Sequence, residues 1–193
     1  VVPFSLNPSS AGSANTLRLG INYRMQWPML GNNYHTVRVS YDQNVYKQMC
    51  SVGASYSYDQ HSNVFGTHEF DAVYAHTFRL ADKHFIRLGL QASYFLNQLR
   101  VDNLTFGDQY DPSNGSILPN SAEQWENQTK GFFDFSVGAS YVFQDKLLLG
   151  FAVYHLAEPD NGFVPNQQFL PRKFVGQVGF IQDLRLNHGL KNY

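Results

Sequence analysis

The seven histidines of this chain offer the widest choice of possible chemistry. They stand at positions 35, 61, 68, 76, 84, 155 and 188, without HxH or HExxH spacing, so the sequence predicts no metal site. His155 precedes Glu158 and Asp160, a grouping that would suit acid–base chemistry. We favour a structural role for His155: it would lie at the end of a strand and fix the loop that follows.

Other signatures of catalysis or ligand binding are weak or missing. Asp108, Asp111 and Asn114 resemble part of a calcium loop, but the glycine position and the terminal glutamate do not fit. The sequence contains no GxSxG, GxGxxG or P-loop motif. Cys50 is the only cysteine, which excludes an internal disulfide and a thiolate zinc cluster. We therefore expect a protein that is not an enzyme and that needs no cofactor.

The composition is unusual for a soluble protein. Charged residues make up 15% of the chain, against ~25% in a typical soluble domain, and aromatic residues reach 16%. A mean hydropathy of −0.34 and the lack of an 18-residue apolar run argue against membrane-spanning helices. The net charge of −1 gives no indication of nucleic-acid binding. Low charge and many aromatics without an apolar helix are typical of a transmembrane β-barrel.

The stretch TLRLGINYRMQW, residues 16–27, shows the pattern of the elements that would position these side chains. Apolar and polar residues alternate strictly in it, which predicts a strand with one apolar and one polar face. The same alternation recurs in segments 37–42, 51–59, 69–79, 86–94, 133–141 and 147–153, and an eighth strand is expected through Phe174, Val178 and Phe180. The fold class expected is therefore all-β, a transmembrane antiparallel β-barrel of at least eight strands.

The charged residues indicate which face of the strands is wet. An arginine facing lipid near the midplane would cost about 2–4 kcal/mol, so the polar faces should line the interior, where opposite charges can pair. The interior charges expected are Arg18, Arg24, Arg38, Asp42, Glu69, Asp71, Arg87 and Asp134. Aromatic residues near strand ends would form the girdles at the membrane surfaces, namely Tyr23, Tyr41, Tyr58, Phe78, Tyr94 and Tyr141. A soluble sandwich is the alternative, but its surface would carry few charges.

The connections between strands alternate in length. The long connections 59–67, 102–130 and 158–171 are expected outside the cell, and the short turns 43–47, 81–83 and 144–146 in the periplasm. Loops longer than ~12–15 residues usually have a function or are disordered. The candidate residues for docking a partner protein are the aromatics of these loops, Phe106, Tyr110, Trp125, Phe163 and Phe169.

Several short motifs resemble one known family over most of the chain. These are NPSSAG at 7–12, YRMQW at 23–27, SYD at 40–42, VYAH at 73–76, LTFGDQ at 104–109, YHLAEPD at 154–160 and LPRKF at 170–174. Their order and spacing resemble the PorP/SprF family of Bacteroidetes outer-membrane proteins. The family-motif residues are Asn7, Pro8, Gly12, Arg24, Gln26, Trp27, His155, Pro171 and Arg172.

This resemblance implies a component of the type IX secretion and gliding machinery in the bacterial outer membrane. The implied partners are other proteins of that machinery, a secreted surface adhesin and outer-membrane lipid. The family usually has Ala where Ser9 stands, and its members continue further at the C-terminal end. The resemblance therefore implies that residues 1–193 form a single barrel domain that lacks its C-terminal strands.

Three functions remain open on the sequence. The first is a non-enzymatic outer-membrane component that anchors or docks secreted surface proteins through its extracellular loops. The second is an outer-membrane pore or a barrel enzyme of phospholipase type. The third is a soluble ligand-binding barrel of lipocalin type, which extraction behaviour would distinguish from the other two.

Overall fold

A computed structural model of the chain describes residues 2–14, 16–27, 29, 34–46, 49–61, 64–101, 107–110, 115–117, 128–144, 146–163 and 168–181. Eight strands make up most of this part: β1 (Arg18–Gln26), β2 (Tyr34–Tyr46), β3 (Cys50–His61), β4 (Phe65–Ala81), β5 (His84–Leu99), β6 (Gln128–Phe143), β7 (Leu147–Tyr154) and β8 (Lys173–Phe180). The all-β prediction is confirmed. Among the described residues, no helix has the length and apolarity needed to cross a membrane.

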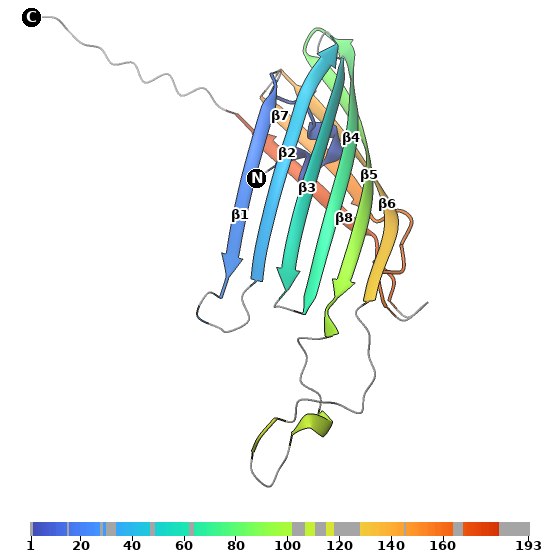
Figure 1. The fold of residues 1–193 in the computed structure, drawn as a ribbon. Coiled ribbons are helices and arrows are strands. Elements are labelled where there is room, and N and C mark those ends of the chain that lie inside the picture. The colour runs from blue at the N-terminus through green and yellow to red at the C-terminus, as the bar shows by residue number, and fades with distance from the viewer. Residues whose placement is uncertain are drawn as a thin grey trace, which may run out of the picture.

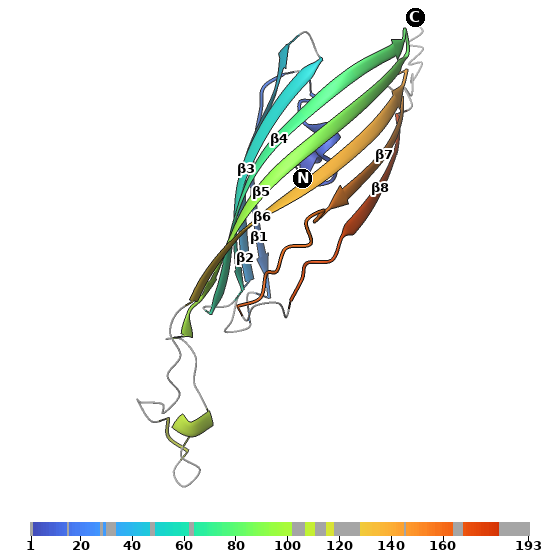
Figure 2. The ribbon, with the colours of Figure 1, turned by 90° about the vertical axis from the view of Figure 1, so that its right-hand side faces the viewer.

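The strands form a single antiparallel sheet in which each strand pairs with its neighbours in the sequence, in the order β1 to β8. Figures 1 and 2 show that this sheet is curled into a half-barrel. Within the described residues, β1 pairs only with β2 and β8 only with β7, so the half-barrel has two open edges. A meander of neighbouring antiparallel strands is the topology of outer-membrane barrels.

Side chains alternate between the two faces of the curled sheet, as the period of a strand requires. In β3, Ser51, Ser55 and Ser57 are buried on the concave face, while Val52 and Ala54 are exposed on the convex face. Large apolar side chains are exposed on the convex face of most strands, including Leu19, Ile21, Phe70, Leu88, Leu90, Phe133 and Phe151. A convex apolar face and a concave face of small polar residues match the wall of a membrane barrel.

Two rows of aromatic residues flank the apolar band of the convex face. Contacts of 2.6–3.2 Å between a hydroxyl and an imidazole nitrogen join Tyr23 with His35, Tyr56 with His68, Tyr74 with His76 and Tyr141 with His84. Along β5, the interval from His84 to Tyr94 covers ~33 Å at ~3.3 Å per residue. For a strand tilted by ~40°, this interval spans roughly 25 Å, the height of the apolar band in outer-membrane barrels.

The connections differ from the prediction at three places. The predicted loop 59–67 is wrong, because β3 and β4 continue toward each other and leave only 62–64 between them. Asp59 and Thr67 are paired across these strands, and the Asp59 carboxylate accepts a hydrogen bond of 2.7 Å from the Thr36 hydroxyl. Likewise, most of the predicted turn 43–47 belongs to β2, and residues 128–130 belong to β6. Polar strand ends of this kind lack the apolar alternation that marks a strand in the sequence.

The two longest connections nevertheless lie at the same end of the half-barrel. They are residues 100–127 between β5 and β6, and 155–172 between β7 and β8. At the opposite end, β4–β5 and β6–β7 are joined by short turns at 82–83 and 144–146. The predicted contrast between long and short connections therefore holds at these four joints.

Residues 2–12, here called the interior segment, lie inside the concavity (Figure 2). The segment contains the short helices η1 (Pro3–Ser5) and η2 (Pro8–Ser10). Its Val2, Phe4 and Ala11 form an apolar cluster with Val73 and Ala75 of β4. The core of the described structure is therefore the contact between this segment and the sheet.

Candidate functional site

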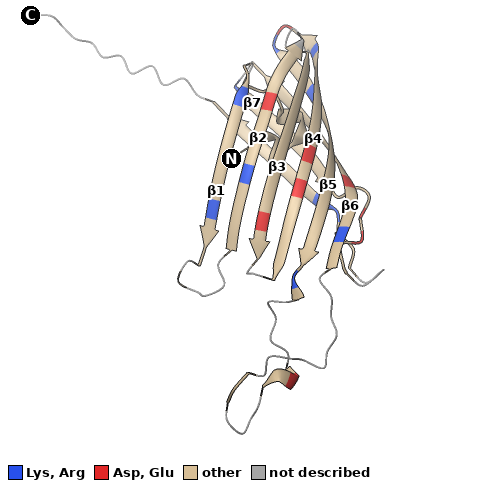
Figure 3. Cartoon of the chain, in the orientation of Figure 1, with Lys and Arg blue, Asp and Glu red and all other residues tan. Residues whose placement is uncertain are grey.

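Charged residues are spread over the strands of the half-barrel (Figure 3). The buried ones, Asp42, Asp71 and Asp134, belong to three clusters of ion pairs and hydrogen bonds. The first cluster is centred on Asp42 of β2, whose side chain is 2% exposed. Arg18 of β1 donates two hydrogen bonds to this carboxylate, of 2.8 Å from Nε and 2.6 Å from Nη2. The backbone N–H of Gly12 donates a third, of 2.7 Å, to Oδ2. This cluster therefore joins the sheet edge to the interior segment.

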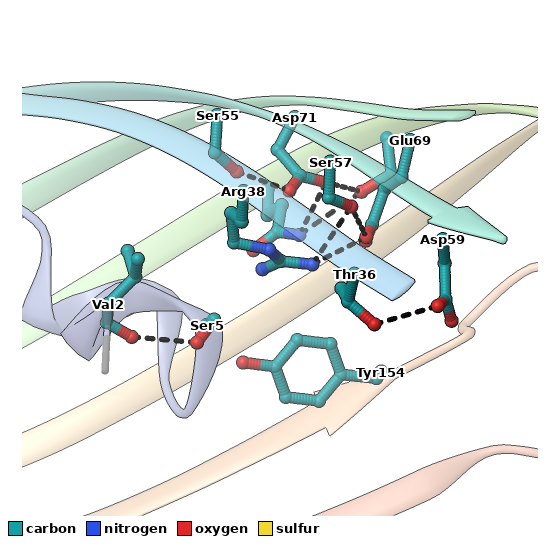
Figure 4. Close-up of polar contacts among 12 residues, drawn as sticks. Val2, Ser5, Thr36, Arg38, Ser55, Ser57, Asp59, Glu69, Asp71 and Tyr154 are labelled. Atoms are coloured by element: carbon teal, nitrogen blue, oxygen red, sulfur yellow. Dashed lines mark hydrogen bonds and ion pairs between the residues drawn. The ribbon is translucent and has the colours of Figure 1, made fainter. Parts of the chain in front are cut away.

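The second cluster lies on β2, β3, β4 and β5, and its Arg38, Ser55, Ser57, Glu69 and Asp71 are shown in Figure 4. Arg38 Nη2 lies 2.6 Å from Glu69 Oε2, and the Ser57 hydroxyl donates a bond of 2.8 Å to the same oxygen. Two residues further along β4, Asp71 accepts hydrogen bonds of 2.6 Å from both Ser55 of β3 and Ser93 of β5. Serines on neighbouring strands thus satisfy carboxylates that would otherwise be costly to bury.

The third cluster joins Asp134 of β6 to His155, which follows β7. His155 Nδ1 lies 2.7 Å from Asp134 Oδ2, and the Asp134 side chain is 2% exposed. His155 has a left-handed backbone with φ of 59°, a conformation that is uncommon for residues other than glycine. The bond to Asp134 holds the chain in this turn, which fits the structural interpretation of His155.

The acid–base grouping suggested by His155, Glu158 and Asp160 is not assembled. Glu158 Oε1 lies 3.5 Å from Arg172 Nε, and Asp160 Oδ2 lies 3.0 Å from Lys130 Nζ. Each of the three residues therefore faces a partner of its own. The contacts of Asp160 with Lys130 and of His155 with Asp134 join the connection between β7 and β8 to β6, whereas that of Glu158 with Arg172 lies within the connection.

The remaining predicted interior charges have other surroundings. Arg87 Nη2 donates a hydrogen bond of 2.6 Å to the carbonyl of Ala11. Arg24 is exposed and forms no ion pair with any residue in the described part of the chain. Arg24 and Arg38 lie beside a small cavity of about 210 Å³ that Val2, Ser5, Asn22 and Thr36 also line.

The residues that suggested calcium binding are only partly described. Asp108 belongs to the short helix η4 (Gly107–Gln109), whereas Asp111 and Asn114 lie outside the described residues. Among the residues that the structure describes, no group of three or more His, Cys, Asp or Glu side chains is arranged to hold a metal ion.

The candidate docking residues lie in different settings. Tyr110 forms an isolated bridge with Ile117, and both side chains are more than half exposed. Phe169 is also more than half exposed, and its backbone pairs with Asp160. Phe163 instead packs edge-on against Phe65, with ring centroids 6.1 Å apart. Phe106 and Trp125 lie outside the described residues.

The family-motif residues occupy three regions. Asn7, Pro8 and Gly12 belong to the interior segment, where all three are buried. Arg24 and Gln26 end β1, and Trp27, with φ of 51°, packs its ring edge-on against Tyr34. His155, Pro171 and Arg172 begin and end the connection between β7 and β8.

Several residues that hold the interior segment could not be identified from the sequence. Ser9 and Ser140 are linked by a hydrogen bond of 2.9 Å between their hydroxyls, and Gly89 and Gly138 lie directly under the segment. The only available signal was the run of small residues on the polar faces of β5 and β6, which is common to many strands.

Comparison with protein families supplies the identity of the chain. The family described as type IX secretion system membrane protein PorP/SprF matches residues 1–191. A comparison with curated proteins found no match. The match covers nearly the whole chain, the half-barrel included, and agrees with the resemblance of its motifs. The chain belongs to the PorP/SprF family of type IX secretion system membrane proteins.

Proposed function

We propose that this chain is a non-enzymatic component of the outer membrane that docks another protein through its long connections. Membership of the family makes it a membrane component of the type IX secretion system, working with other components of that system. We further propose that this membrane is the outer membrane and that the long connections face the outside of the cell. The proposed partner is a secreted surface protein such as an adhesin.

The observation that carries this proposal is the exposed aromatic and aliphatic surface of the long connections. Tyr110, Ile117 and Phe169 are 57–63% exposed, although none of them belongs to the convex face of the sheet. Large exposed aromatics are the residues that most often contribute the binding energy of protein interfaces. The ion pair between Lys130 and Asp160 supports one of these connections against β6, which reduces the entropy lost on binding.

The convex and concave faces also argue against a lipase-type barrel. A catalytic serine, a histidine and an acid would need to meet on the lipid-facing surface. Four described histidines on the convex face, namely His35, His68, His76 and His84, contact tyrosine hydroxyls instead. The serines of the strands are mainly on the concave face.

The open edges of the sheet support a larger barrel. β1 and β8 each present unpaired backbone groups within the described residues, and such groups cannot remain unsatisfied in lipid. We propose that the wall formed by β1–β8 is completed by further strands.

Docking is tested by replacing Tyr110, Trp125 and Phe169 with alanine together. We expect the triple variant to lose co-purification and surface display of its partner by at least about tenfold, because Trp and Tyr are enriched among the interface residues whose truncation costs about 2 kcal/mol or more. The measurement is quantitative mass spectrometry of proteins that co-purify with the tagged chain, combined with antibody detection of the partner on intact cells.

The matched control is Met49→Ala, which removes an exposed apolar side chain at the short-turn end. This control should leave co-purification unchanged. Both proteins must remain heat-modifiable on gels, which reports a folded barrel. If the triple variant is folded and still recovers its partner as well as Met49→Ala does, the long connections are not the docking surface.

A further inference from the structure

The interior segment fills the concave face rather than resting on its rim. Phe4 and Ser9 are fully buried, and Asn7 is 1% exposed. Figure 2 shows the segment within the curl of the sheet, in the half nearer the short turns. This half of the interior contains the first part of β5 and the last part of β6, where Gly89 and Gly138 lie.

On one side, hydrogen bonds attach the interior segment to β6. The Asn7 side chain donates from Nδ2 to the carbonyl of Ala139 at 3.2 Å. Its Oδ1 accepts from the backbone N–H of Ser9 at 3.0 Å and from the Ser9 hydroxyl at 2.8 Å. The Ser9 hydroxyl also lies 2.9 Å from that of Ser140. Asn7 therefore caps η2 and fixes it to the wall at the same time.

On the other side, the end of the segment is held by charged groups of three strands. Arg87 of β5 donates to the carbonyl of Ala11, and the N–H of Gly12 donates to Asp42 of β2. Asp42 is in turn held by Arg18 of β1. The segment therefore spans the concavity from β6 to the β1–β2 edge.

The wall is shaped to receive this segment closely. A Cβ atom on Gly89 would lie 2.2 Å from the backbone nitrogen of Ser9, and one on Gly138 would lie 2.1 Å from Oδ1 of Asn7. These two glycines are paired across β5 and β6. Gly150 of β7 continues the same surface, since its Cβ would lie 2.9 Å from Asn7 Nδ2. Glycine within a strand often marks a place where another backbone approaches closely.

We propose that the interior segment is a stopper that closes the short-turn half of the interior to the passage of solutes. Small polar residues such as Ser51, Ser93, Ser136 and Ser140 line the concave face. A barrel interior with such a lining holds water and admits ions when it is vacant. The segment occupies this space with buried side chains and anchors them on both walls. The intact barrel therefore does not conduct, and a barrel whose segment is displaced does.

The test compares Gly89→Ala with Gly176→Ala in the full-length protein. The first substitution places a methyl group against the backbone of Pro8 and Ser9, whereas a Cβ on Gly176 meets nothing within 4 Å. Purified proteins are reconstituted in phospholipid vesicles, and the entry of small sugars is measured by vesicle swelling. We expect the wild type and Gly176→Ala to be tight and Gly89→Ala to be at least about tenfold more permeable, because the added methyl group would overlap the backbone of the seated segment.

Two further measurements keep this test decisive. In a Cys50→Ser background, Ser140→Cys places a single thiol on the wall beneath the segment. The reaction of this thiol with a small water-soluble reagent shows whether the segment has left the wall. Asn7→Ala removes the side chain that attaches the segment to β6 without adding bulk, and it carries the same expectation if Gly89→Ala does not fold. The proposal is overturned if the wild type is as permeable as the variants. It is also overturned if a folded variant exposes position 140 and remains tight.

Discussion

Leu90→Arg is expected to lower the free energy of unfolding by about 2–4 kcal/mol, because it would place a charge in the middle of the convex face, which we propose to face lipid. Leu90 is 59% exposed on the convex face. On β5, Leu90 lies four residues from Ile86 and four from Tyr94. Ile86 is paired with Tyr141 of one aromatic row, and Tyr94 lies near the other aromatic row. The measurement is guanidinium unfolding of the protein in lipid vesicles, followed by tryptophan fluorescence.

Leu80→Arg is the matched control for this prediction. Leu80 is 63% exposed but lies near the end of β4, beside the turn at 82–83. A charge at that depth should cost only about 0–1 kcal/mol. On a surface that faces water, both substitutions would change stability by no more than about 0.5 kcal/mol. Equal and small effects would therefore contradict the membrane assignment of the convex face.

Asp42→Ala should lower the free energy of unfolding by about 3 kcal/mol, because it leaves the charge of Arg18 without its partner. The Asp42 side chain is 2% exposed and Arg18 is 29% exposed, which places the expected cost at the lower end for buried pairs. The substitution also frees the N–H of Gly12. The same unfolding measurement applies, with Arg18→Ala and the double variant completing a double-mutant cycle.

Asp59→Ala is the control for Asp42→Ala. Asp59 accepts a hydrogen bond from Thr36 and contacts His61, but its side chain is 38% exposed. An exposed interaction of this kind contributes about 1 kcal/mol or less. If Asp42→Ala costs no more than Asp59→Ala, the cluster that links β1, β2 and the interior segment does not stabilise the fold.

The strands and their faces follow from the sequence because period-two alternation is a local property. Val52 and Ser55, for example, face opposite sides because their positions differ by an odd number, whatever strand lies beside them. The ends of β3 and β4 were missed for the complementary reason. Residues such as Asp59 and Thr67 lie beyond the apolar band, where pairing is maintained by backbone and polar contacts that leave no alternation.

The partners of the interior charges depend on register, which the sequence does not specify. Asp42 meets Arg18 because the two are directly paired between β1 and β2. Asp134 meets a histidine rather than an arginine because the turn after β7 returns His155 over β6. The motif NPSSAG indicated a family but no position in space. Its place in the concavity depends on Gly89 and Gly138, which lie far from it in the chain.

Cysteine labelling on intact cells tests most directly the claim that the chain crosses the outer membrane with its long connections outside. In a Cys50→Ser background, single cysteines would replace Ser116 and Asn161 in the long connections and Lys146 in the turn between β6 and β7. An impermeant maleimide should label positions 116 and 161 on intact cells, and position 146 only after the cells are permeabilised. Labelling of position 146 alone on intact cells would invert the orientation, and equal labelling of all three before and after lysis would contradict a membrane-spanning barrel.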